Sequence, residues 1–80
     1  MRVQEKILEL KERRKQVFDK YLRFYESDEI GAHVLLFSNK VDGMVRRLNK
    51  VEGDVIPEIY LEELVRIDSL FEECLQMMNG

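Results

Sequence analysis

The 80-residue chain lacks the residues that would define most scaffolds other than a packed helical one. It has one cysteine, Cys74, which excludes an internal disulfide. The chain has only one proline and four glycines, and it is 45% hydrophobic. Both features argue against disorder, because disordered chains contain few hydrophobic residues and many helix-breaking ones. Its apolar runs fall well short of the roughly 20 residues that span a bilayer, and no signal-peptide pattern is present. We expect one domain, residues 1–80, in the cytoplasm and without a membrane segment.

What the chain does contain is three apolar stripes with helical spacing. Steps of three and four residues place side chains on one side of an α-helix. The stripes predict an all-α protein, an antiparallel three-helix bundle with helices near residues 2–26, 28–51 and 56–78. Their members are Val3, Ile7, Leu10, Val17, Tyr21 and Phe24, then Ile30, Val34, Phe37, Val41, Met44, Leu48 and Val51, then Ile56, Tyr60, Leu64, Ile67, Phe71, Cys74 and Met78.

Residues between the stripes suit helix ends. Ser27 is a good N-cap, and Asp28 and Glu29 place negative charge in the first turn that follows. Gly53 suits a helix end, and Pro57 suits the start of the next helix. The connections between helices are therefore expected to be short.

The three stripes should meet in one core. We expect Phe37, Val41, Leu64, Ile67 and Phe71 to be buried together. An alternative for the middle of the chain is a buried strand at 33–37 followed by a hairpin turn at 42–43. That alternative breaks the continuous second stripe, whereas a glycine within a helix costs only about 1 kcal/mol, so the helix is preferred.

Charge is distributed unevenly along the chain. Residues 1–24 carry eight Lys/Arg and four Asp/Glu, whereas residues 52–80 carry eight acids and one arginine, Arg66. The basic run at 11–15 could contact phosphates, but the net charge of −3 argues against nucleic acid as a partner. We interpret this run as a solvated face. Arg14 falls within an apolar stripe, where it could extend to solvent, pair with an acid of the third helix or specify register.

No set of residues forms a recognisable catalytic or metal-binding motif. The sequence Asn39-Lys40-Val41-Asp42 resembles the guanine-specificity motif of GTPases, but the chain has no phosphate-binding loop. His33 and Cys74 are the sole histidine and cysteine, and no ligand spacing accompanies them. We therefore expect no catalytic residues, no cofactor and no metal, with the motif lying on the second helix as a polar patch.

Two stretches resemble known helical families. The apolar spacing of the second and third helices, with residues 48–53 between them, is similar to BAG domains, which implies binding to the ATPase domain of Hsp70 chaperones. The long first helix and residues 56–58 are similar to small all-helical chorismate mutases. That resemblance implies a dimeric enzyme with basic side chains around a dicarboxylate, and Arg14 is the candidate for such a role.

The preferred interpretation is a non-enzymatic protein–protein interaction module, such as a small adaptor, inhibitor or regulator. Its predicted partner site is Glu62, Val65 and Glu73, on the outer side of the third helix, where carboxylates flank an aliphatic side chain and suit a basic surface. A homodimer is also predicted, from wide apolar faces at Phe18, Leu22 and Tyr25 and at Leu70 and Met77.

Overall fold

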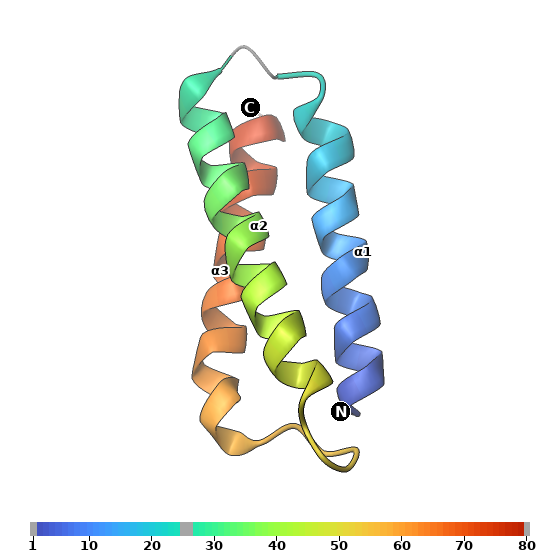
Figure 1. Ribbon diagram of the computed structural model, residues 1–80. Helices are drawn as coiled ribbons and strands as arrows, with labels where there is room; N and C mark the ends of the chain where they lie inside the picture. The colour runs from blue at the N-terminus through green and yellow to red at the C-terminus, as the bar shows by residue number, and fades with distance from the viewer. Residues whose placement is uncertain (1, 25–26, 80) are drawn as a thin grey trace.

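The computed structural model describes residues 2–24 and 27–79, and within them the chain forms three packed helices. They are α1 (Val3–Tyr21), α2 (Asp28–Asn49) and α3 (Leu61–Asn79), with a short 3₁₀ helix, η1 (Glu58–Tyr60), before α3. α2 runs antiparallel to α1 and α3, so the chain passes up, down and up through a bundle of 42 × 19 × 16 Å (Figure 1). The predicted all-α three-helix bundle is confirmed.

The core is built from all three predicted stripes. Phe37, Val41 and Ile67 are completely buried, and Leu64 is nearly so. Phe71 differs from the prediction because it is only partly buried. Its ring packs against that of Phe37, with centroids 5.8 Å apart, while the guanidinium of Arg13 lies over it at 5.1 Å. A charged side chain at the edge of the α1–α3 interface therefore covers part of Phe71 in place of apolar atoms.

The start of α2 follows the sequence prediction closely. The Ser27 side chain accepts a hydrogen bond from the backbone N–H of Ile30, at 3.3 Å, and this caps the helix. α2 then continues unbroken through 33–37 and 42–43, so the alternative strand and hairpin are wrong. The first helix, however, ends earlier than predicted. α1 stops at Tyr21, and the N–H groups of Arg23 and Phe24 bond to carbonyls three residues back, which tightens the chain into turns.

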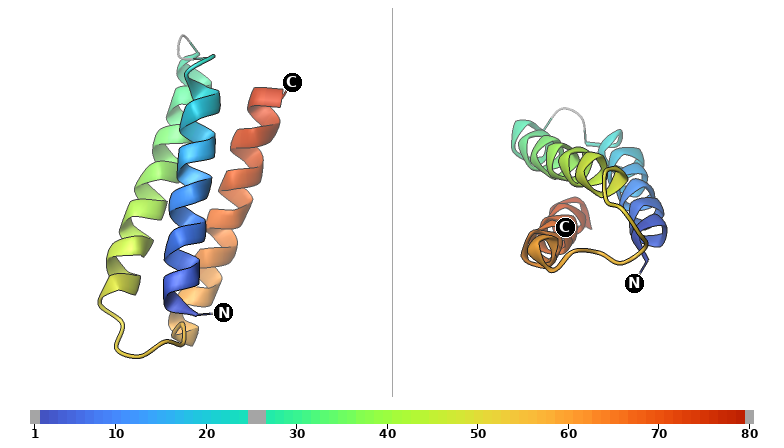
Figure 2. Two further views of the ribbon diagram at one scale, coloured as in Figure 1. Left: turned by 90° about the vertical axis from the view of Figure 1, so that its right-hand side faces the viewer. Right: turned by 60° about the horizontal axis from the view of Figure 1, so that its bottom comes forward.

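The third helix begins later than the predicted residue 56, because the chain is extended up to Val55 and then forms the 3₁₀ helix η1 before α3. Arg2 and Val55 form an antiparallel bridge, and the Val3 N–H donates to the Asp54 carbonyl at 3.0 Å. Gly53, which was predicted to end the second helix, lies four residues beyond it with φ at 90°, a conformation that glycine adopts without strain. The connection therefore crosses the end of the bundle to reach α1 before turning into α3 (Figure 2).

Candidate interaction surfaces

The predicted partner site lies on the outer side of α3. Glu62, Val65 and Glu73 are all exposed, and the core-facing residues Leu64, Ile67 and Cys74 occupy the opposite side of the helix. Val65 is 63% exposed, and Leu61, one turn before it, is 48% exposed. Residues four apart are neighbours on a helix surface, so Leu61 and Val65 form one small aliphatic strip. The structure therefore brings the three predicted residues to a common solvent-facing side.

The negative charge of this side is partly balanced. Arg66 Nη2 lies 2.8 Å from Glu62 Oε1, and both side chains are more than two-thirds exposed. Surface pairs of this kind contribute little, about 0–1 kcal/mol, because water and salt screen them. Glu73 makes no ion pair among the described residues. A partner cation could thus engage Glu73 directly and could displace Arg66 at small cost.

Arg47 and Glu63 link α2 to the first turn of α3, next to this side of the helix. Arg47 Nη1 donates to Glu63 Oε2 at 2.6 Å and Nη2 donates to Oε1 at 3.0 Å, which is a bidentate pair between α2 and α3. The hydrogen bonds from Arg47 hold the pKa of the Glu63 carboxyl below its usual value, while desolvation opposes the shift. The same bonds raise the pKa of Arg47. Glu63 therefore anchors the first turn of α3 and leaves Glu62 on the solvent side.

Neighbouring arginines of α1 connect it to the two other helices. Arg14 Nε lies 3.1 Å from Asp42 Oδ1, so its acidic partner is on α2, and of the three alternatives considered for Arg14 the pairing with an acid of the third helix is wrong. The arginine that does reach α3 is Arg13, which pairs with Asp68 and, at 2.7 Å, with Glu9 Oε1. Side-chain direction on a helix changes by about 100° per residue, which explains why adjacent arginines contact different helices.

Three features of the sequence were considered as possible chemical sites, and all three lie on helices: the motif at 39–42 and His33 on α2, and Cys74 on α3. The Asn39-Lys40-Val41-Asp42 stretch is part of α2, where Val41 is fully buried. His33 lies on α2 with Nδ1 3.0 Å from the Glu29 carbonyl oxygen. Cys74 is buried, and its Sγ lies 3.6 Å from the His33 carbonyl oxygen. Within residues 2–24 and 27–79, no group of three His, Cys, Asp or Glu side chains is placed to hold a metal ion.

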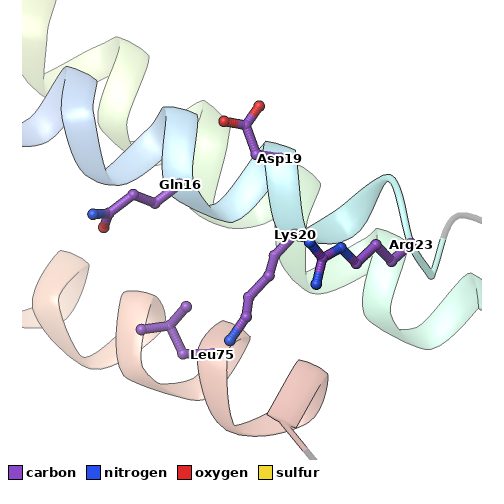
Figure 3. A pocket seen from close by; sticks show the side chains of 5 residues that line it. All are labelled: Gln16, Asp19, Lys20, Arg23 and Leu75. Carbon is purple, nitrogen blue, oxygen red and sulfur yellow. The ribbon is translucent and has the colours of Figure 1, made fainter.

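Several shallow hollows lie between the helices, and the sequence pattern did not reveal them. One of about 400 Å³ opens between α1 and α3, where Lys20 extends toward Leu75 and hydrogen-bonds to Asn79 (Figure 3). Two others lie between α1 and α2. The basic hollow, of about 420 Å³, is lined by Lys11, Arg14, Val41, Asp42, Val45 and Arg46. The aromatic hollow, of about 370 Å³, is lined by Phe18, Tyr21, Asp28, Gly31, Val34 and Leu35.

The apolar faces predicted to mediate dimerisation have different surroundings. Leu22 is 67% exposed beyond the end of α1, whereas Phe18 and Leu70 pack against the core. Tyr25 lies outside the described residues. Self-association stays a prediction, and light scattering at micromolar concentration measures it.

Comparison with protein-family models, curated proteins and solved structures finds no match for this chain. None of the helices in the described part of the chain combines the length and the apolar character that a bilayer crossing requires. Function is therefore inferred from the surfaces of the molecule.

Proposed function

We propose that the protein is a non-enzymatic interaction module, a small adaptor, inhibitor or regulator, that binds a basic surface of a partner protein through the outer side of α3. The observation that carries the proposal is the exposure of Val65 between Glu62 and Glu73, on a side of the helix that the core does not use. Carboxylates steer a basic partner toward this side, and the aliphatic strip of Leu61 and Val65 supplies the contact that excludes water.

The bundle itself supports a binding role for this side. The core is filled by apolar side chains from all three helices, so the outer side of α3 can change without removing core contacts. Leu64 and Ile67 pack α3 into the core, and the Arg47–Glu63 pair adds a contact between α2 and the first turn of α3. A partner would therefore meet a rigid helix face, and rigid faces lose little conformational entropy on binding.

The test compares two double charge reversals in a pull-down from native extract, quantified by mass spectrometry. Glu62→Lys with Glu73→Lys should lose the partner protein, with the loss greatest at low salt because screening is weakest there. The matched control is Glu12→Lys with Glu52→Lys, which makes the same change in net charge at exposed positions away from α3. The control should retain the partner. Equal retention by both variants, with unchanged helical signal, would contradict the proposal.

A second candidate is the small all-helical enzyme of the chorismate mutase kind. The basic hollow favours it, because Lys11, Arg14 and Arg46 converge there and could hold a dicarboxylate. The pairing of Arg14 with Asp42 argues against this candidate, because the salt bridge already neutralises one of the three cations. An assay for chorismate mutase activity separates the candidates, since the interaction module should show no turnover.

A further inference from the structure

We propose that the groove between the outer sides of α1 and α2 is a second binding surface, which takes an acidic amphipathic helix of a partner protein. The surface extends from the basic hollow to the aromatic hollow. It differs in position and in charge from the outer side of α3, so it goes beyond the function proposed above.

The two hollows lie along the same α1–α2 interface, with no lining residue in common. Their linings follow steps of three and four residues, first along α1 at Lys11, Arg14, Phe18 and Tyr21 and then along α2 at Asp28, Gly31 and Leu35 and at Asp42 and Arg46. Such steps keep residues on one side of a helix, so α1 contributes one continuous wall. On α2 the two linings are separated by the seven-residue step from Leu35 to Asp42, about two turns, and therefore also face the same side of the helix. The guanidinium of Arg14, which lines the basic hollow, lies over the ring of Phe18, which lines the aromatic hollow, at 5.0 Å, so the two hollows are adjacent.

The basic hollow has positive charge that the protein does not neutralise. Asp42 is its acidic lining residue, and Asp42 is already paired with Arg14. Lys11 and Arg46 form no ion pair among the described residues. Between these cations the floor is apolar: Val45 is partly buried and offers surface to a partner, whereas Val41 is completely buried. The basic hollow thus suits a carboxylate that is carried next to an apolar group.

The aromatic hollow offers apolar contact. Leu35 is 59% exposed although it lines this hollow beside Phe18 and Tyr21. Covering an exposed leucine is favourable by about 25 cal/mol for each Å² removed from water. Asp28 lies at this end of the groove, so partner carboxylates are disfavoured here and favoured at the basic hollow. The groove therefore has a direction, apolar at one end and cationic at the other.

This arrangement selects the kind of partner. Leu35 and Arg46 are eleven residues apart on α2, which corresponds to about 16 Å along the helix. A partner helix lying in the groove would place apolar side chains and acidic side chains about three turns apart to meet both ends. Nucleic acid would gain from Lys11 and Arg46 but would leave the leucine and the valine floor without apolar contact, and the acidic net charge of the protein opposes it.

The experiment selects binders from a displayed library of 18-residue helical peptides with randomised faces. The groove predicts binders rich in Asp or Glu at one end and in Leu, Ile or Phe at the other. Calorimetry then measures the affinity of a selected peptide for the parent protein and for each variant that keeps the helical content of the parent. Lys11→Gln with Arg46→Gln should weaken binding about tenfold, while Lys40→Gln with Arg23→Gln, the same charge change away from the groove, should leave it unchanged.

A second matched pair tests the apolar end. Leu35→Ser should weaken binding about fivefold. Leu36→Ser is the control, because Leu36 is also exposed, at 46%, yet lies about 100° around the helix and does not line the groove. Loss with Leu35→Ser and retention with Leu36→Ser supports the groove, and equal effects of the two overturn it.

Other outcomes overturn the inference without touching the function proposed for α3. They are an absence of enriched acidic binders, stronger binding to a DNA duplex than to the selected peptides, and a dimer in light scattering that Lys11→Gln with Arg46→Gln converts to a monomer. Glu62→Lys with Glu73→Lys should leave peptide binding at the groove intact. The two surfaces can therefore fail independently.

Discussion

Arg47 and Glu63 join α2 to the first turn of α3 through two parallel hydrogen bonds of 2.6 and 3.0 Å. The pair lies at the rim of the bundle, with 42% of the arginine side chain and 24% of the glutamate side chain exposed. Its net contribution to folding should therefore be modest, about 0.5–1 kcal/mol, because solvent screens it. It acts mainly as a positional constraint on the helix that carries the proposed partner site.

The pairing makes stability depend on pH in a defined direction. The pKa of Glu63 in the folded state lies below its usual value, 4.5. Its contribution is therefore fully present above that value and is lost as pH falls through the lower, folded pKa. We expect Glu63→Gln to reduce stability at neutral pH. We also expect it to weaken the fall of the free energy of unfolding at acidic pH. Urea unfolding at a series of pH values measures this. Glu62→Gln, which removes an exposed carboxylate, should leave the stability at neutral pH and its dependence on pH nearly unchanged.

The aromatic pair of the core predicts unequal losses on truncation. Phe37→Ala should cost about 3–5 kcal/mol because the ring is completely buried. Phe71→Ala should cost less, since Arg13 rather than apolar side chains covers part of that ring. Urea denaturation followed by circular dichroism gives both values. If Phe37→Ala does not fold, Phe37→Leu and Phe71→Leu provide the comparison. A larger loss at Phe71 would contradict the burial described above.

Glycines 31 and 43 of α2 should respond differently to the same substitution. A Cβ on Gly43 would lie 3.4 Å from Arg47 Nη2, an ordinary contact, so Gly43→Ala should stabilise the helix by about 1 kcal/mol. A Cβ on Gly31 would lie 2.7 Å from the Tyr21 hydroxyl, which would have to move. Gly31→Ala should therefore gain less or lose stability. In a Tyr21→Phe background the penalty should shrink, and thermal unfolding records each difference.

Cys74 should report opening of the bundle. Its side chain is 1% exposed, and burial, with a smaller effect from the charge of Glu73, raises the pKa of its thiol. Because thiolate is the reactive form, a disulfide reagent at mildly alkaline pH should modify the folded protein slowly and the urea-unfolded protein rapidly. Ser69→Cys in a Cys74→Ala background places a thiol on the exposed side of α3 and should react at once. Equal rates for folded and unfolded protein would show that Cys74 is accessible.

The sequence by itself determined the helical class, most of the core and the solvent-facing side of α3. A 3.6-residue period places Val41 and Ile67 inside, and it leaves Glu62, Val65 and Glu73 outside whatever the neighbouring helices do. The cap at Ser27 was equally readable, because its hydrogen bond joins residues three apart. These features depend on the spacing of residues that are close in sequence, so the sequence alone predicts them.

The tertiary structure decided what depends on contacts distant in sequence. The bridge between Arg2 and Val55 holds the chain extended before η1, and no local sequence pattern predicts a contact between residues 53 positions apart. The choice of Asp42 for Arg14, and of Asp68 for Arg13, follows from which helix each side of α1 meets. The groove between α1 and α2 arises in the same way. Its two walls are each readable as helix faces, but their meeting is set by the packing of one helix against the other.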